Sequence, residues 1–203
     1  MTYPIFPPHT PLVLGTYNRK KLLELAELLT PLGCPLSTLA DFPQAIVVDE
    51  TGDTFAANAA LKASEQAVHL GAWVLGEDSG LSVDALGGRP GVFSARYAGP
   101  AATDEQNNRL LLEELAAVPA DRRTAHYTCH VTLSDPTGQI VARSEAYCRG
   151  LIRSQPTGTA GFGYDPLFEI VEYHRTFAEL GVAVKRVLSH RARAVGRLVE
   201  MLI

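Results

Sequence analysis

The sequence predicts an α/β protein built on a mixed β-sheet, and two observations carry this prediction. Short apolar runs typical of buried strands alternate with segments in which apolar residues recur every three or four positions, the period of a helix. Two longer runs, 124–134 and 140–150, flank Asp135-Pro136-Thr137-Gly138, a composition typical of a hairpin turn. Because hairpin strands are antiparallel, we expect a mixed sheet and not a purely parallel, doubly wound one.

Capping residues and glycine stops set the expected order of the elements. Asn18 is placed to cap the first helix, and Ser189 is placed to cap the last. Asp53 or Thr54 caps the second helix, which Gly71 ends. In chain order we expect strands at 12–15, 45–48, 72–75, 124–134 and 140–150, and helices that begin near residues 19, 54, 104 and 190.

Length and composition are those of an ordinary globular protein. The 203 residues suit a single domain over 1–203, with an irregular, proline-rich tail at 1–10. Three cysteines without pair or metal spacing indicate a reducing compartment, and we expect neither a signal peptide nor a membrane span. The expected location is therefore the cytoplasm, without a membrane partner. A net charge of −4 disfavours a nucleic-acid partner, which requires a strongly basic surface.

The helix that begins at Arg19 starts with charges of the wrong sign. Arg19, Lys20 and Lys21 fill its first turn, where the helix dipole makes each cation unfavourable by roughly a few tenths of a kcal/mol. A strand, a short turn and a cationic helix start together suit a phosphate group, which backbone N–H groups and lysines would share. A solvated helix end is the alternative. The absence of a Walker A loop and of a GxGxxG motif disfavours P-loop kinases and Rossmann enzymes.

Carboxylates follow two of the predicted buried strands. Glu50 follows 45–48, while Glu77 and Asp78 follow 72–75. If the two strand ends lie together, their carboxylates could hold Mg2+, which takes oxygen ligands, and one could accept a proton from an attacking water. Exposed turns are the alternative, since Asp78-Ser79-Gly80 has the composition of a turn.

Two further segments combine glycine, aromatic and charged residues. In Gly161-Phe162-Gly163-Tyr164-Asp165, glycine permits close approach to a ligand, an aromatic ring could stack on a base, and the aspartate could accept from ring N–H donors. Lys185, and the pair His190 and Arg191 at the start of the last helix, could donate to phosphate or to a keto oxygen. The alternatives are a plain turn around a core aromatic and a surface His-Arg pair.

In this order, the motifs resemble the inosine triphosphate pyrophosphatase family, whose members are also called dITP/XTP pyrophosphatases. Each motif is short, but the ordered set runs over 16–191, nearly the whole chain, and is highly specific. The matching segments are Thr16-x-Asn18-x-x-Lys21, Glu50 to Phe55 with Asn58-Ala59 and Lys62-Ala63, Asp78 to Leu81, Gly88 to Tyr97, Gly161 to Phe168, Thr176 to Leu180, Lys185, and Ser189-His190-Arg191.

The resemblance implies a fold, a reaction and a set of residue roles. The implied fold is an elongated mixed sheet flanked by helices, with two lobes and the active-site cleft between them, in a homodimeric protein. The implied reaction is Mg2+-dependent hydrolysis of non-standard purine nucleoside triphosphates (ITP, dITP and XTP) to the monophosphate and pyrophosphate. Glu50 and Asp78 would bind Mg2+, and Asp78 would also be the general base. The residues implied to bind substrate are Thr16, Tyr17, Asn18, Arg19, Lys20, Lys21, Ser79, Phe162, Gly163, Tyr164, Asp165, Lys185, His190 and Arg191.

Two positions depart from the family pattern, and three other functions stay open. Glu77 stands where an aspartate is usual, and Ala57 stands where a glutamate is frequent. The alternatives are a Maf-like nucleotide pyrophosphatase of other base specificity, a nucleotide sensor without catalysis, and a single-stranded nucleic-acid binding module. The acidic net charge disfavours the last of these.

Overall fold

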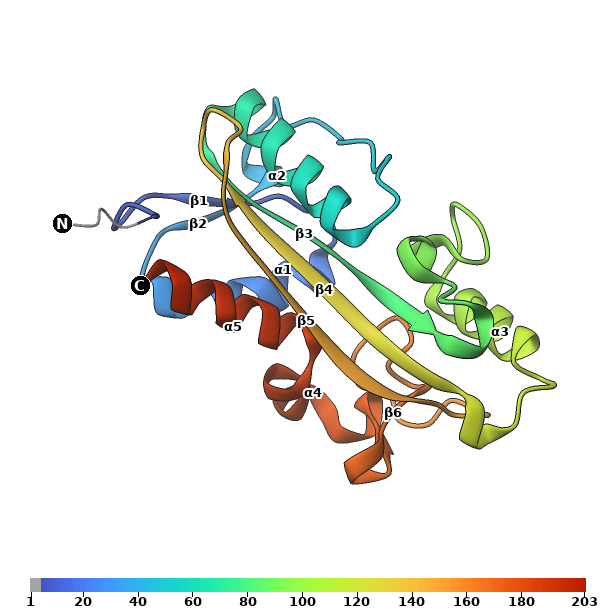
Figure 1. Cartoon of the computed structure of the whole chain (residues 1–203). Coiled ribbons are helices and arrows are strands. Elements are labelled where there is room, and N and C mark those ends of the chain that lie inside the picture. The colour runs from blue at the N-terminus through green and yellow to red at the C-terminus, as the bar shows by residue number, and fades with distance from the viewer. Residues whose placement is uncertain (1–4) are drawn as a thin grey trace. The chain divides into compact units, whose positions relative to one another are not determined.

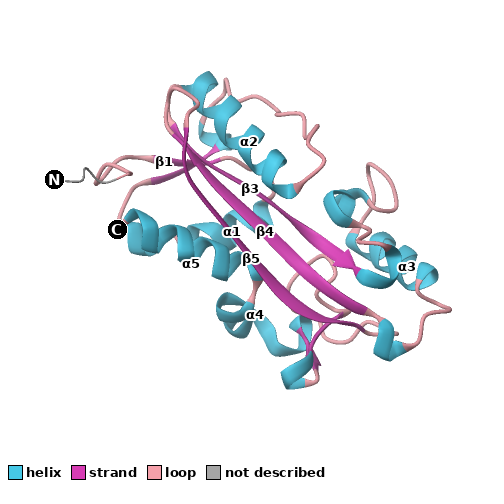
Figure 2. Cartoon of the chain, viewed as in Figure 1, coloured by secondary structure: helices cyan, strands magenta, loops and turns pink. Residues whose placement is uncertain are grey.

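Helices and strands alternate along most of the chain in the computed structural model, which describes residues 5–203 (Figures 1 and 2). The strands are β1 (Leu12–Leu14), β2 (Leu36–Thr38), β3 (Trp73–Val83), β4 (Thr124–Ser134), β5 (Ile140–Ile152), β6 (Phe168–Ile170) and β7 (Arg175–Thr176). The helices are α1 (Arg19–Leu28), α2 (Phe55–Leu70), α3 (Asp104–Glu114), α4 (Phe177–Leu188) and α5 (His190–Leu202). No helix in the described part of the chain is both long and apolar enough to cross a bilayer.

Seven strands form a mixed sheet in the order β2-β1-β3-β4-β5-β6-β7. Strand β1 is parallel to both β2 and β3, whereas β6 is antiparallel to both β5 and β7. The predicted turn between β4 and β5 is present, and the N–H of Gly138 donates to the carbonyl of Asp135 at 3.0 Å. The predicted mixed α/β fold is therefore confirmed.

The caps of the first two helices are the residues that the sequence indicates. The side-chain oxygen of Asn18 accepts from the backbone N–H groups of Lys20 and Lys21, which satisfies two of the helix's unpaired donors. Of the two candidates for α2, Thr54 is the cap, and its hydroxyl accepts from the N–H of Ala57 at 3.1 Å.

Two predicted strands differ from the structure. The prediction at 45–48 is wrong: the backbone of Ile46 bonds to the side-chain amide of Gln66 and not to a strand, and Val47 is 80% exposed. The strand that follows α1 in the chain is instead β2, which pairs with β1 at one edge of the sheet. The strand predicted at 72–75 is longer than expected, because β3 continues through Glu77 and Asp78 to Val83.

Part of the predicted N-terminal tail, residues 1–4, lies outside the described residues. Residues 5–10 contain no helix or strand, as expected. Phe6 is nevertheless buried, and its ring packs edge-on against Trp73 with centroids 5.2 Å apart.

The chain divides into two compact units, and β3, β4 and β5 supply residues to both. The first unit comprises Met1–Asp78, Cys129–Ala146 and Arg191–Ile203, and the second comprises Ser79–Thr128 and Tyr147–His190. The predicted single domain and the predicted cleft both stay predictions.

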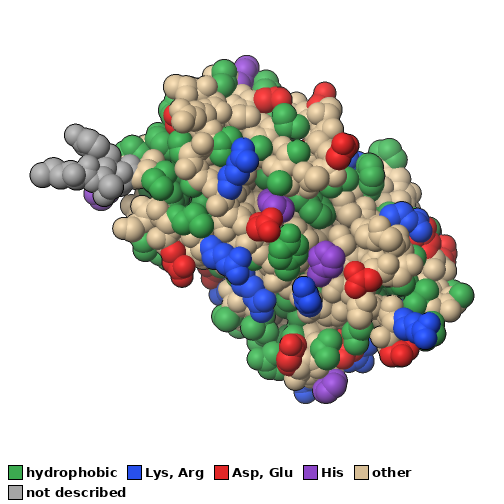
Figure 3. All heavy atoms as spheres, viewed as in Figure 1, with side chains coloured by type: hydrophobic (Ala, Val, Ile, Leu, Met, Phe, Trp, Pro, Cys, Tyr) green, Lys and Arg blue, Asp and Glu red, His purple; other side chains and the backbone are tan. Residues whose placement is uncertain are grey.

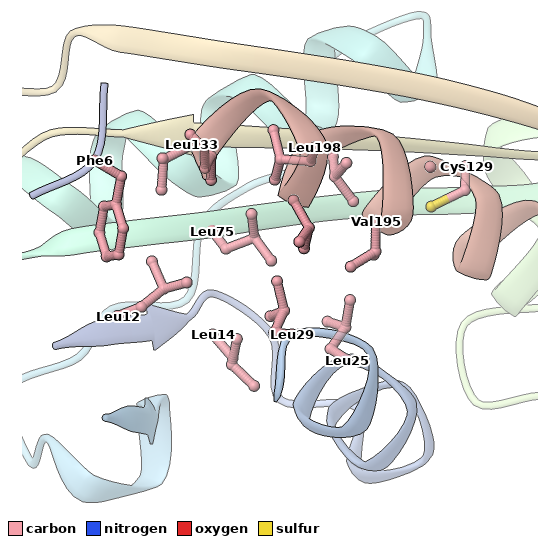
Figure 4. Close-up of a cluster of buried hydrophobic side chains, with 14 of the residues drawn as sticks. Phe6, Leu12, Leu14, Leu25, Leu29, Leu75, Cys129, Leu133, Val195 and Leu198 are labelled. Atoms are coloured by element: carbon pink, nitrogen blue, oxygen red, sulfur yellow. The ribbon is translucent and has the colours of Figure 1, made fainter. Parts of the chain in front are cut away.

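The first unit has a helix layer on each face of its strands (Figure 1). Helices α1 and α5 cover one face, where Leu25 and Leu198 pack with Leu14 and Leu75 of the strands (Figure 4). Helix α2 covers the other face, which the alternation of strand side chains supplies with Val13, Val74 and the other members of a smaller cluster. The predicted apolar face of the last helix is confirmed by five buried residues: Ala192, Val195, Leu198, Val199 and Leu202.

The second unit has a core of its own, built around aromatic side chains. The ring of Phe168 packs on Tyr127 at 4.6 Å and stacks on Phe177 at 5.6 Å between centroids. Leu81 and Leu111 join them from β3 and α3. Tyr164, near the end of the glycine-rich segment 158–165, belongs to this core.

Candidate active site

Two adjacent acids on β3 point to opposite faces of the first unit. Side chains alternate along a strand, so Glu77 faces α1 and α5 while Asp78 faces α2. They therefore belong to two separate groups of charges. The prediction that both acids follow the end of a strand is wrong, because both lie within β3.

Asp78 is 5% exposed and lies against two polar side chains of α2. Its Oδ1 accepts from the Lys62 ammonium at 2.9 Å, and its Oδ2 accepts from the Asn58 amide at 3.4 Å. Burial raises the pKa of Asp78 above its ordinary value, and the attraction of Lys62 and Lys21 offsets only part of that rise. A raised pKa strengthens the carboxylate as a base, which suits a proton acceptor.

Glu50 reaches the same ammonium from the loop before α2. Its Oε1 lies 3.0 Å from Lys62 Nζ, so two carboxylates from separate segments converge on one positive charge. Asn58 fixes this loop, because its side-chain oxygen accepts from the N–H of Gly52 at 2.8 Å. Ala57 stands where the family frequently has a glutamate. In this chain only its backbone N–H takes part here, and it donates to the Thr54 hydroxyl.

The pair Glu50 and Asp78 fits a magnesium ion. Within residues 5–203 there is no group of three or more His, Cys, Asp or Glu side chains arranged to hold a metal. Mg2+ does not require one, since proteins commonly hold it through one or two carboxylates, with phosphate and water as the other ligands. Two carboxylates already converging on one cation are a donor set of this kind.

Helix α2 reaches this position because it lies unusually close to β3 at Gly76. A Cβ atom at this residue would lie 2.2 Å from the carbonyl oxygen of Ala59 and 2.7 Å from the backbone nitrogen of Ala63. Only glycine permits such an approach. The close contact places Asn58 and Lys62, one helical turn apart, beside Asp78.

A methyl group at position 76 is therefore expected to separate α2 from β3. Gly76→Ala should lower the free energy of unfolding by about 1–3 kcal/mol or more, measured by urea denaturation. The matched control is Gly196→Ala in α5, where an added Cβ meets nothing within 4 Å. Because alanine favours a helix over glycine, this control should stabilise the protein by up to about 1 kcal/mol. Equal stability of the two variants would show that α2 does not approach β3 in this way.

Glu77 is the centre of the second group of charges, on the face toward α1 and α5. It is fully buried, and its Oε1 accepts from Arg191 Nη2 at 3.0 Å and Nε at 3.2 Å, while its Oε2 lies 2.8 Å from Lys21 Nζ. Arg191 is 1% exposed and also pairs with Glu24. The thiol of Cys129 completes the group at 3.4 Å from Oε1, and burial raises its pKa well above the ordinary value.

This second group bears on two of the sequence-based expectations. The extra methylene of Glu77 does not point toward Asp78, because the two side chains leave opposite faces of β3. The guanidinium of Arg191 binds carboxylates inside the first unit, where its pKa is raised: burial alone would lower it, but attraction to Glu77 and Glu24 outweighs burial. The assignment of Arg191 to substrate binding stays a prediction.

The cationic start of α1 is partly exposed and partly turned inward. Thr16 accepts from the N–H of Asn18 at 3.2 Å, which shapes the turn before the helix. Arg19 and Lys20 are exposed, whereas Lys21 turns toward Glu77. The hydroxyl of Tyr17 donates at 3.4 Å to backbone carbonyls of the loop at 45–46. The six residues predicted to bind substrate here, Thr16, Tyr17, Asn18, Arg19, Lys20 and Lys21, form the turn before α1 and its first turn.

In the second unit, Asp165 organises the glycine-rich loop. Its Oδ2 accepts from the N–H of Phe162 at 2.8 Å and from the Lys185 ammonium at 2.6 Å. The same ammonium lies 4.1 Å from the centre of the Phe162 ring, a cation–π contact. Gly161 has φ +81°, and a Cβ there would lie 2.1 Å from Asp165 Oδ2, so this position requires glycine.

Contacts to α3 and to the loop around Ser94 fix the rest of this segment. Gly163 donates its N–H to Asp104 at 2.9 Å, and its carbonyl accepts from Asn108 at 3.0 Å. Tyr164 is buried and donates its hydroxyl to the carbonyl of Ser94 at 2.8 Å. Burial raises the pKa of this tyrosine. The structure therefore brings Phe162, Gly163, Tyr164, Asp165 and Lys185 together, and their predicted role in substrate binding stays a prediction.

Two predicted residues of the second unit, His190 and Ser79, come from other elements. His190 is buried and stacks on Tyr127, with ring centroids 4.6 Å apart and planes 7° from parallel. Ser79 lies on β3 and is partly exposed. Their roles in substrate binding stay predictions.

Sequence reasoning did not assign a role to Asn58 or Lys62, which contact Asp78 directly. A signal was present: two polar residues spaced four apart in an alanine-rich helix lie on one face beside the alanines that pack inward. The partners Glu24 and Cys129 of the Glu77 group carry no such signal, since they are distant in the sequence.

Carboxylates and lysines that share one face of an α/β sheet define a class of protein suited to phosphate chemistry. A sequence model of the Ham1 family matches residues 12–201. Among curated relatives, the dITP/XTP pyrophosphatase of Rhodopirellula baltica is 56% identical over 95% of this chain and 92% of that protein. The dITP/XTP pyrophosphatase of Desulforamulus reducens is 47% identical over 94% of each.

Solved structures agree with these sequence relatives. A HAM1 protein from Coxiella burnetii has a TM-score of 0.87 and 37% identity, over 95% of this chain and 98% of that one. A nucleoside-triphosphatase / dITP/XTP pyrophosphatase from Mycobacterium abscessus has a TM-score of 0.77 and 40% identity, over 95% of this chain and 100% of that one. The chain belongs to the Ham1 family, and the resemblance identified in the sequence is confirmed.

Proposed function

We propose that this chain hydrolyses non-standard purine nucleoside triphosphates, ITP, dITP and XTP, to the nucleoside monophosphate and pyrophosphate. The observation that carries the proposal is the convergence of Glu50 and Asp78 on one cation position, in a chain whose relatives are named dITP/XTP pyrophosphatases. Both carboxylates contact the ammonium of Lys62, and carboxylates beside a cation suit a metal-bound triphosphate.

We propose Mg2+ as the cofactor, held by Glu50 and Asp78. When bound, it would supply positive charge that offsets the charge growing on the departing phosphates. Lys62 is the nearest cation of the chain to both carboxylates, and the cationic start of α1 would add charge toward the triphosphate.

Asp78 is proposed to accept the proton of the attacking water. The water oxygen bonds to the α-phosphorus, and the bond from that phosphorus to the oxygen bridging to the β-phosphorus breaks. The proton passes to Asp78, and pyrophosphate leaves with the bridging oxygen. Burial of Asp78, which raises its pKa, favours this proton transfer. In the metal-free structure, Asn58 and Lys62 donate to the two oxygens of this carboxylate.

Base selection is proposed to depend on the six position of the purine. A 6-keto oxygen accepts from a donor, whereas the 6-amino group of adenine would leave that donor unpaired, a loss of roughly 1–3 kcal/mol for a buried group. Backbone N–H groups, His190 and Arg191 are the candidate donors. Of these, Arg191 already binds Glu77 and Glu24, so base reading would require it to give up part of that contact.

The alternatives receive less support than hydrolysis. Positive and negative side chains are interspersed on the face shown in Figure 3, and the net charge is −4, which does not suit binding along a nucleic-acid backbone. A sensor without catalysis is supported only by the two departures from the family pattern, Glu77 and Ala57. The side chain of Glu77 points to the face of β3 opposite to that of Asp78. A homodimer in the cytoplasm is the proposed state of the protein.

Isotope transfer from water tests the proposed bond cleavage. ITP would be hydrolysed in water enriched in heavy oxygen, and the products analysed by phosphorus NMR and mass spectrometry. We expect the label in inosine monophosphate and none in pyrophosphate, because the water attacks the α-phosphorus. Label in pyrophosphate, or release of inosine diphosphate and phosphate, would contradict the proposal. A methylated pyrimidine triphosphate hydrolysed faster than ITP would favour the Maf-like alternative.

A further inference from the structure

The Lys62 ammonium occupies the position where the two proposed metal ligands meet. It lies 2.9 Å from Asp78 Oδ1, 3.0 Å from Glu50 Oε1 and 3.2 Å from the carbonyl oxygen of Glu77. Three oxygens from two segments therefore surround one nitrogen. The side chain of Lys62 is 12% exposed, so little water shares this site.

Charge alone explains why a cation must stand here. Two carboxylates close together in a partly buried site repel each other and lose hydration, unless a positive charge lies between them. The Lys62 ammonium lies 2.9 Å from Asp78 and 3.0 Å from Glu50, so it supplies that charge.

Two other cations of the first unit, Lys21 and Arg191, bind the side chain of Glu77 on the opposite face of β3. Lys62 extends from α2, whose backbone lies close to Gly76 of β3 at Ala59 and Ala63, so a shift of the ammonium requires rotation of its side chain and not movement of the helix.

We propose that Lys62 is a stand-in cation that holds Glu50 and Asp78 in place and is displaced when a divalent metal binds between them. Once displaced, the ammonium becomes available to an anionic phosphate of the nucleotide. A metal without nucleotide must compete with the ammonium, whereas a metal arriving with a nucleotide offers that ammonium a new partner. Metal and nucleotide therefore bind with positive coupling. This inference rests on the proposed function, because it assigns Glu50 and Asp78 to the metal.

Metal affinity without nucleotide is the direct test. Mn2+ binding would be measured by electron paramagnetic resonance for the wild type and for Lys62→Gln, whose amide keeps a donor near Asp78 but carries no charge. We expect Lys62→Gln to bind Mn2+ at least about tenfold more tightly than the wild type. Lys62→Arg keeps the charge and should bind like the wild type. Arg143→Gln removes an exposed charge from the same unit and controls for net charge. Equal or weaker binding by Lys62→Gln would overturn the inference.

A measurement on the wild type keeps the inference testable if Lys62→Gln does not fold. The chain has four lysines, at 20, 21, 62 and 185, so acylation by an amine-reactive ester can be followed peptide by peptide. Mn2+ should free the Lys62 ammonium from its carboxylates and increase its acylation, while exposed Lys20 serves as the internal reference. Unchanged or reduced acylation of Lys62 at saturating Mn2+ would overturn the inference.

The stand-in role of Lys62 and the proposed function can be disproved separately. If Lys62→Gln binds Mn2+ no more tightly while the wild type releases pyrophosphate from ITP, the stand-in role is wrong and the proposed function stands. If affinity rises as expected but no pyrophosphate is released from any purine triphosphate, the proposed function is wrong and the stand-in role stands.

Discussion

Replacing Asp78 by asparagine is expected to give a folded protein that releases pyrophosphate from ITP at least about 100-fold more slowly than the wild type. Asparagine has the same shape but accepts no proton, and it removes one of the two charges proposed to bind the metal. Asp78 is buried and its pKa is raised, so the variant also removes the proposed proton acceptor from the site. Turnover at saturating Mg2+ measures the effect on the reaction apart from metal affinity.

The control for this variant is Asp49→Asn. Asp49 is exposed and precedes Glu50 in the same loop, so its replacement removes an equal charge without touching the proposed site. It should retain turnover within about twofold. Near-normal turnover of Asp78→Asn at saturating Mg2+ would rule out Asp78 as the general base.

The second large effect concerns stability. Glu77→Gln is expected to lower the free energy of unfolding by about 3–5 kcal/mol, because it removes the charge of the fully buried carboxylate that pairs with Arg191 and leaves the guanidinium only Glu24. Lys21 loses its partner in the same variant. Urea denaturation followed by circular dichroism gives the difference directly.

The control is Glu65→Gln on the exposed side of α2, which should change stability by no more than about 0.5 kcal/mol. If Glu77→Gln had the same free energy of unfolding as the wild type, the pair of Glu77 and Arg191 would not stabilise the first unit. The position at which the chain departs from the family pattern would then be free of structural constraint.

The sequence predicted most helices because their signals are local. Asn18, Thr54 and the apolar face of α5 act within one or two turns of the chain, where caps and periodicity operate. Helix α4 escaped prediction because Gly181, with φ +79°, interrupts its pattern. Its start did carry a signal, since the side chains of Thr176 and Glu179 form a capping box.

The strands were harder to predict, because their partners are distant. An apolar run at 45–48 satisfies its backbone through Gln66, which no periodicity reveals. Conversely, β3 continues through Glu77 and Asp78 because each finds cations brought by other elements. From the sequence alone, an acid after an apolar run is interpreted as lying beyond the end of the strand, because the cations that allow it to be buried are not known.

For the candidate site too, local features were predictable and contacts between distant residues were not. Its residue types were predictable from motifs, but the contacts of Lys185 with Asp165 and Phe162 were not. The contact between Glu77 and Arg191 joins residues 114 positions apart, and only the fold brings them together. The place of Lys62 between Glu50 and Asp78 likewise depends on how closely α2 approaches β3 at Gly76.

Pyrophosphate release from ITP, XTP, GTP and ATP, each with and without Mg2+, tests the proposed function most directly. The wild-type protein should release pyrophosphate from ITP and XTP, much less from GTP and ATP, and none from any of them once the metal is chelated. Release from ATP as fast as from ITP, or undiminished release without a divalent metal, would contradict the proposed substrate class or the proposed cofactor.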